Sequence, residues 1–249
     1  MSDFWWRFKM AVRNFWREMD GFLSRFMTPG VRAIFAINVA VFFFGMLTMP
    51  LSATMRWVFY RLMETPADAL GHLYLWQFVT YMFLHAGGWH LAMNMLMLWF
   101  FAPRLEHRWG TRAFWRFYLT VGIGAGLFHA LVAYATASSS GASNVFNPML
   151  GASGAIYGIL LAYAMYYPND TVLLYFVIPI RVKYLVFILG AVTLMASLHS
   201  AAFDDARDNI SHATHLGGLA VAFAYLKIGD WRSRRPRRVD PRRHPDFWR

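Results

Sequence analysis

The sequence predicts an all-α membrane protein, a bundle of six transmembrane helices preceded by an amphipathic interfacial helix. Hydrophobic residues make up 58% of the 249 residues and charged residues only 15%, whereas an ordinary soluble domain carries about 25% charged residues. A large soluble protein with buried core helices is the alternative, and five separate uncharged runs count against it. These runs are 33–55, 69–103, 117–169, 184–203 and 209–226.

Six spans follow from these five runs, because a spanning helix needs roughly 20 mostly apolar residues. The run 117–169 is too long for one span and is interrupted by SSSGASNVFNP at 138–148. Each span must be helical, since lipid offers the backbone no hydrogen-bond partner. The predicted spans are 33–51, 88–104, 114–136, 151–167, 184–200 and 211–228.

The basic residues predict the orientation of the bundle. With six spans, all 24 lysines and arginines except Arg56, Arg61 and Arg207 lie on the side that holds both termini. Basic residues accumulate on the cytoplasmic side of membranes, so both termini are predicted to be cytoplasmic. The net charge of +11 then indicates contact of the basic tails with anionic lipids rather than with nucleic acid.

Three regions follow: a cytoplasmic amphipathic segment at 1–29, the six-helix domain at 30–228, and a basic tail at 229–249 that is predicted to be disordered. The first segment has apolar residues every three or four positions with arginines between them, which is typical of a helix in the headgroup layer. A partner-binding helix is the competing interpretation. The apolar positions are Trp5, Phe8, Val12, Phe15, Met19, Phe22 and Phe26.

Cysteine is absent from the chain, which excludes disulfides, thiolate metal sites and thiol catalysis. No cleavable signal peptide is visible, because the apolar residues of the N-terminus are interleaved with charges. A compact six-span chain of this kind is expected, by analogy, in a bacterial inner membrane. We expect no cofactor and no metal, and the oligomeric state stays open.

Ser153 lies in the stretch GASGAIYG, at the predicted start of the span 151–167. Its neighbours on both sides are glycine and alanine, so another backbone can approach the hydroxyl closely. At a helix N-terminus, unpaired N–H groups and the positive end of the helix dipole can stabilise an oxyanion. The alternative is a simple helix cap, the commonest role of a serine at such a position.

Polar groups in other apolar helices are functional candidates by default, because they are costly there. His215 lies in SHATHLGGLAVA, whose small residues allow close helix packing; a histidine at a helix end is the alternative. His212, one turn earlier, has the weaker case. His90 and Asn94 in HLAMN lie on one helix face and can donate hydrogen bonds to an oxyanion; an interhelical hydrogen bond is the alternative.

Tyr157 lies one turn after Ser153 on the same helix face. It can stack on an imidazole and orient it, or serve only as a buried aromatic. No Asp or Glu occurs in 88–104, 151–167 or 211–228. The sequence therefore predicts a dyad of serine and histidine rather than a triad.

These motifs resemble those of the rhomboid family of intramembrane serine proteases. GASGAIYG, with a tyrosine four residues after the serine, resembles the active-site motif of the family, and HLAMN and THLGG resemble its motifs in the second and sixth spans. The stretches 76–106 and 167–184 are similar as well. The resemblance covers about residues 30–228, and the three motifs occur in the order of the family.

The resemblance implies an endopeptidase that cleaves transmembrane segments of membrane-protein substrates. Its site would be a water-filled cavity that opens away from the cytoplasm. By motif, Ser153 matches the nucleophile and His215 the general base. His90 and Asn94 match oxyanion donors that act together with the serine N–H.

The resemblance also implies residues and segments that support the active site. Gly151 matches the backbone position before the nucleophile, and Tyr157 the ring packed against the catalytic histidine. The loop 52–87 would be embedded in one leaflet, the span 184–200 would be a lateral gate, and 201–210 would cap the cavity.

Two departures from the family pattern are visible. Many relatives carry an arginine where this chain has Gln77, so a salt link is expected to be missing, and Ala222 stands where glycine is commoner. Neither touches the reacting groups. The alternatives to a protease are a non-enzymatic rhomboid-like protein that binds client helices and a small transporter, which would more naturally carry intramembrane carboxylates.

Overall fold

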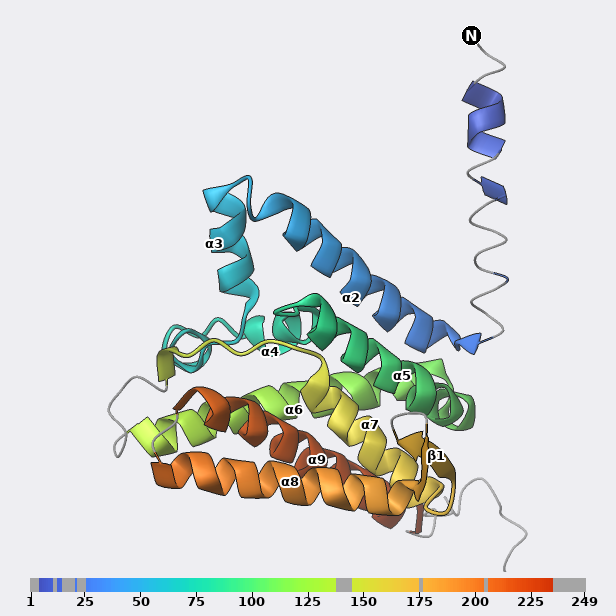
Figure 1. The fold of residues 1–249 in the computed structure, drawn as a ribbon, viewed down its shortest axis with the longest axis vertical. Helices are drawn as coiled ribbons and strands as arrows, with labels where there is room; N and C mark the ends of the chain where they lie inside the picture. The colour runs from blue at the N-terminus through green and yellow to red at the C-terminus, as the bar shows by residue number, and fades with distance from the viewer. Residues whose placement is uncertain are drawn as a thin grey trace, which may run out of the picture.

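The structure, a computed structural model, describes residues 5–10, 13–14, 21, 26–137, 145–174, 177–203 and 206–234, and this part of the chain is mostly helical. Its long helices are α2 (Pro29–Thr48), α5 (Gly88–Trp109), α6 (Thr111–Ala137), α7 (Ser153–Tyr166), α8 (Val182–Phe203) and α9 (Ala206–Arg234) (Figure 1). Between α2 and α5 lie α3 (Ala53–Leu62), η1 (Ala67–Gly71), α4 (Gln77–Thr80) and η2 (Tyr81–Phe83). A hairpin of β1 (Thr171–Leu174) and β2 (Ile178–Arg181) joins α7 to α8.

A helix lies at the position of each predicted span. Among the described residues, α2 and α6 are by themselves long and apolar enough to cross a membrane. Two further apolar helices are shorter, namely α7 and the part Val182–Leu198 of α8. The uncharged runs of the sequence therefore predict where the helices lie, and the helical class of the fold is as expected.

Helix α7 packs against α5, α6, α8 and α9, and Figure 1 shows it between α5 and the pair of α8 and α9. Its closest approach is to α9, where a Cβ added to Gly218 would lie 2.1 Å from the carbonyl oxygen of Gly154. Only a residue without a side chain permits this approach. The contact fixes the position of α9 along α7, and with it the position of His215 relative to Ser153.

Glu106 connects the start of α2 to the junction of α5 and α6. This residue is 2% exposed. Its carboxylate accepts hydrogen bonds from the backbone N–H groups of Gly30 at 2.8 Å and Val31 at 2.9 Å. The hydroxyl groups of Thr111, at 2.6 Å, and Thr28 also donate to it. Because the first N–H groups of a helix have no partner within the helix, Glu106 serves as an N-terminal cap supplied by another helix.

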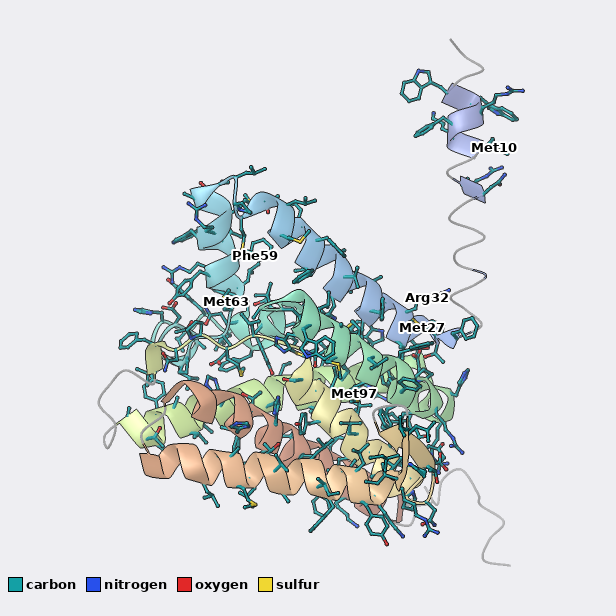
Figure 2. The ribbon with its side chains drawn as sticks, viewed as in Figure 1. Met10, Met27, Arg32, Phe59, Met63 and Met97 are labelled. Atoms are coloured by element: carbon teal, nitrogen blue, oxygen red, sulfur yellow. The ribbon has the colours of Figure 1, made fainter. Side chains whose placement is uncertain are left out.

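The other end of α2 packs against α3. Phe59 of α3, labelled in Figure 2, stacks on Phe44 with ring centroids 6.3 Å apart. Its ring also lies so close to Gly45 that a Cβ there would meet it. Both helices lie on the same side of α5 in Figure 1, opposite α8. The loop predicted at 52–87 thus contains helical elements and an ordered apolar contact with α2.

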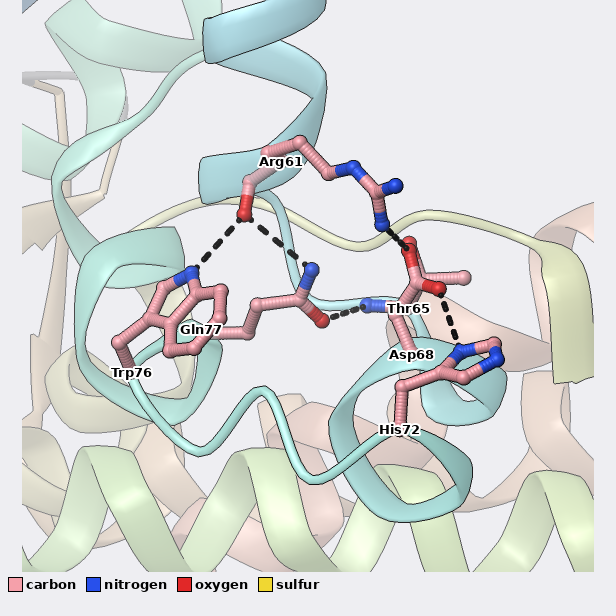
Figure 3. A network of polar contacts seen from close by, with 6 residues as sticks. All are labelled: Arg61, Thr65, Asp68, His72, Trp76 and Gln77. Atoms are coloured by element: carbon pink, nitrogen blue, oxygen red, sulfur yellow. Dashed lines mark hydrogen bonds and ion pairs between the residues drawn. The ribbon is translucent and has the colours of Figure 1, made fainter.

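Gln77 of α4 holds the segment that follows α3. Its Oε1 accepts from the backbone N–H of Thr65 at 3.1 Å, and its Nε2 donates to the carbonyl oxygen of Arg61 at 3.2 Å (Figure 3). The guanidinium of Arg61 pairs with Asp68 at 3.2 Å, and Asp68 also contacts His72. Where the family resemblance led us to expect a missing salt link, the glutamine makes neutral hydrogen bonds to the backbone.

The structure differs from the sequence predictions at several boundaries. The hairpin was not predicted; Val172 lies opposite Ile180 in its register, and both pack on the main core. Most of the expected cap at 201–210 is helical, because residues up to Phe203 belong to α8 and those from Ala206 on belong to α9; positions 204 and 205 lie outside the described residues. Helix α9 also continues to Arg234, into the predicted tail.

Parts of two further predictions lie outside the described residues. In the predicted amphipathic segment, 5–10 and 13–14 are helical, and most of the remaining positions up to 25 are not described. The same holds for 235–249 of the predicted tail.

Candidate active site

Ser153 is the first residue of α7. Two residues before it, Gly151 has a φ of +126°, a conformation that side-chain-bearing residues rarely adopt. A Cβ on Gly151 would lie 2.8 Å from Cε1 and 2.9 Å from Nε2 of His90. The glycine therefore allows the chain to turn into α7 while pressed against the imidazole of α5.

His215 of α9 lies beside this serine. Its Nε2 is 2.9 Å from Ser153 Oγ, within hydrogen-bond distance. The ring of Tyr157, one turn along α7, stacks on the imidazole with centroids 4.1 Å apart and an interplanar angle of 6°. The structure thus brings the predicted serine, histidine and tyrosine into direct contact, and the stacking fixes the plane of the imidazole.

A cavity of about 100 Å³ lies over this pair, and the residues that line it come from α5, α9, the start of α7 and the segment before it. A space of this size holds a few water molecules. The lining residues are His90, Met149, Leu150, Gly151, Ser153, Thr214 and His215. Four of the six residues predicted for the site therefore share one cavity.

Asn94, the second predicted oxyanion donor, lies one turn after His90 on α5 and outside this lining. It is 7% exposed, and its Nδ2 is buried without a hydrogen-bond partner in the described part of the chain. An unpaired buried amide is costly and is free to donate to a group that enters the site. The weaker candidate His212 lies near His215, with ring centroids 6.5 Å apart.

No third residue orients the histidine from behind within the described residues. His215 Nδ1 is buried there and has no hydrogen-bond partner. The same part of the chain holds no group of three His, Cys, Asp or Glu residues placed to bind a metal ion. The geometry corresponds to a pair of serine and histidine, with orientation supplied by Tyr157 rather than by a carboxylate.

His85 is a neighbour of the site that the sequence analysis did not single out. Its ring lies 5.0 Å from that of His90, and both of its nitrogens are buried without a partner in the described residues. Burial and the nearby His90 lower the pKa of His85 to about 4. The spacing of five residues from His90 was the available signal, but it does not correspond to one helix face.

A second, apolar cavity of about 190 Å³ adjoins the first and shares Leu150 with it. Its walls come from α2, α3 and the segment 84–87, and they include Phe42, Phe59 and His85. This cavity was not predicted, because its walls come from segments that are far apart in the sequence. It offers an apolar recess next to the cavity that Ser153 lines.

Fold and site together define a class: a helical membrane protein that holds a serine and a histidine in contact beneath a small cavity. The sequence model of the family described as the Rhomboid domain matches residues 72–230, more than half of the chain. The chain belongs to the rhomboid family.

Curated relatives are similar over about three fifths of the chain. Identity is 32% to RHOMBOID-like protein 12, mitochondrial, of Arabidopsis thaliana, over 63% of this chain and 47% of the relative. It is 31% to Rhomboid protease AarA of Providencia stuartii, over 61% and 57%, and 33% to Rhomboid protease GluP of Bacillus subtilis, over 59% and 25%. The matched region thus spans less than two thirds of each relative.

Proposed function

We propose that this protein is an intramembrane serine endopeptidase that cleaves transmembrane segments of membrane-protein substrates. The observation that carries the proposal is the distance of 2.9 Å between His215 Nε2 and Ser153 Oγ at the start of a helix. The relatives named as rhomboid proteases support it. No cofactor takes part.

The reaction is acyl transfer at a peptide bond. His215 Nε2 accepts the proton of Ser153 Oγ as the oxygen attacks a substrate carbonyl carbon, and the protonated imidazole then gives that proton to the leaving amine. Water, activated by the same histidine, hydrolyses the acyl-enzyme. The substrate helix must unwind at the cut, so we expect small, helix-breaking residues there.

The oxyanion is stabilised by the N–H of Ser153 and by the side chains of His90 and Asn94. The unpaired Nδ2 of Asn94 supplies a donor that needs no other bond to break. Loss of one such donor costs roughly 3 to 4 kcal/mol of transition-state stabilisation. Asn94→Ala is therefore slow rather than inactive.

In the membrane, α2, α5, α6, α7, α8 and α9 are the six spans, with both termini in the cytoplasm. The lysine and arginine distribution supports this orientation, and the basic residues at the cytoplasmic end contact anionic lipids. The serine end of α7 then faces away from the cytoplasm. We place the protein in a bacterial inner membrane, in keeping with its bacterial relatives; import into isolated mitochondria would contradict this.

Labelling with a serine-reactive fluorophosphonate tests the proposal. The membrane-embedded wild type is expected to be labelled at Ser153, as identified by peptide mass spectrometry, whereas Ser153→Ala and His215→Ala are not. An unlabelled but folded wild type would favour a protein that binds client helices without cleaving them. Such a binder would retain client capture as Ser153→Ala.

A further inference from the structure

The segment that leads into Ser153 is paired with the loop between α2 and α5. Glu64 and Met149 exchange two backbone hydrogen bonds, 3.0 Å from Glu64 N–H to the Met149 oxygen and 2.7 Å in the opposite direction. Two residues later, the N–H of Gly151 donates to the carbonyl oxygen of Tyr81 at 2.9 Å. The segment 149–151 is thus held at two points, and because Met149 forms an isolated β-bridge we refer to this segment as the strand 149–151.

The side chain of Glu64 ties this strand to α6. Its carboxyl group contacts Nδ1 of His129, and the two residues are 0% and 1% exposed. Burial raises the pKa of Glu64, while the hydrogen bond and charge of His129 act in the opposite direction. A buried pair of this kind is weak evidence for stability, because desolvation offsets the attraction.

The strand also contacts the surroundings of two candidate catalytic groups, His90 and His215. Gly151 presses on the imidazole of His90, and the sulfur of Met149 accepts a hydrogen bond from Thr214, the residue before His215. A shift of the strand would therefore move the oxyanion side of the site relative to Ser153. Displacement by about 1 Å can cost on the order of 100-fold in rate.

We propose that Glu64 and His129 are a positioning pair, which fixes the strand 149–151 and through it the geometry of His90 and Ser153. The inference rests on the proposed protease function. Neither residue touches the reacting atoms. The pair acts through the backbone of Met149, and its expected effect is on kcat rather than on KM.

Four variants in proteoliposomes test the pair: Glu64→Leu, Glu64→Gln, His129→Leu and the double leucine variant. Each leucine variant should lower kcat for a transmembrane substrate and the rate of fluorophosphonate labelling on the order of tenfold or more, with KM unchanged. Glu64→Gln keeps a group that can hydrogen-bond to His129, so it should retain most of the activity. All rates are divided by the fraction of folded protein at the assay temperature. Thermal unfolding curves give this fraction and the unfolding midpoint.

The double variant separates positioning from stability. Replacing both partners of a buried hydrogen bond by apolar groups can be nearly neutral for stability. We therefore expect its unfolding midpoint to return toward the wild type while kcat stays low. Recovery of kcat together with the midpoint would overturn the proposal, because the pair would then be only structural.

Glu106→Leu is the matched control, since Glu106 is a second buried glutamate that ties helices together without touching the strand. It should lower the unfolding midpoint but leave the labelling rate per folded protein unchanged. A wild type that is not labelled would overturn the protease function itself. A labelled wild type with equal rates for Glu64→Leu and Glu106→Leu would overturn the positioning role alone.

Discussion

Two buried glutamates hold this molecule together in different ways. Glu106 accepts hydrogen bonds from two backbone N–H groups and two hydroxyls at the start of α2. The side chain of Glu64 has His129 as its hydrogen-bond partner, and its Oε1 is buried without one in the described residues. A fully hydrogen-bonded carboxylate stabilises a fold, whereas an incompletely bonded one is costly and needs another explanation.

The same contrast extends to the surroundings of the two residues. Around Ser153, buried polar atoms of His85, Asn94 and His215 have no hydrogen-bond partner in the part of the chain that the structure describes. Both carboxylate oxygens of Glu106, by contrast, accept hydrogen bonds. The hydrogen bonds of Glu106 therefore favour stability, whereas the protease that we propose would use the unpaired groups near Ser153 to bind its substrate.

The largest effect is expected at Glu106. In Glu106→Leu, two N–H groups and two hydroxyls lose their acceptor at roughly 1 kcal/mol each, so the free energy of unfolding should fall by about 4 kcal/mol. Denaturation in mixed micelles measures this loss. A decrease of less than about 1 kcal/mol would contradict the stabilising role that we assign to Glu106 in contrast to Glu64.

Gly151→Ala should mainly impair activity. The added Cβ would meet His90 at 2.8 Å in a backbone conformation with φ of +126°, so kcat/KM should fall on the order of 100-fold. Gly88→Ala is the control, because a Cβ there meets no atom within 4 Å. Equal activities of the two variants would contradict the close contact of the strand with His90.

Acidification should lower the stability of the fold through His85, next to the candidate site. The folded-state pKa of His85 is lowered to about 4 from its ordinary 6.5, so the unfolded state binds more protons between these values. Above pH 6.5 His85 is neutral in both states and does not lower the free energy of unfolding. As the pH falls from 6.5 to 4 the unfolded state takes up the proton first, and the free energy of unfolding decreases by about 2 kcal/mol after solvent screening.

Thermal midpoints between pH 7 and pH 4 measure this effect. His85→Gln should show a smaller decline than the wild type, while the exposed His107→Gln should follow the wild type. A decline unchanged in His85→Gln would assign the acid sensitivity to other groups.

The smallest effect is expected at Tyr157. Its stacking on His215 is worth about 1 kcal/mol, so Tyr157→Leu should lower kcat about fivefold. Tyr157→Phe keeps the ring and should match the wild type. If phenylalanine is as slow as leucine, the hydroxyl and not the stack is what matters.

The sequence predicts the helices well because each lies in an uncharged run, and it predicts Ser153, His215 and Tyr157 because they lie in short local motifs. It does not predict the hairpin, whose contacts depend on packing against the core. Nor does it predict the link from Glu64 to Met149 and His129. Those pairings span 65 residues or more, and a single glutamate in a loop gives no local signal of its partner.

Cleavage of a transmembrane substrate in proteoliposomes tests the central claim most directly. The wild type should cut within the membrane-spanning segment, as mapped by mass spectrometry of both products. Ser153→Ala and His215→Ala should each give no product while folding like the wild type. Undiminished cleavage by either variant would contradict the assignment of Ser153 as nucleophile and His215 as its base.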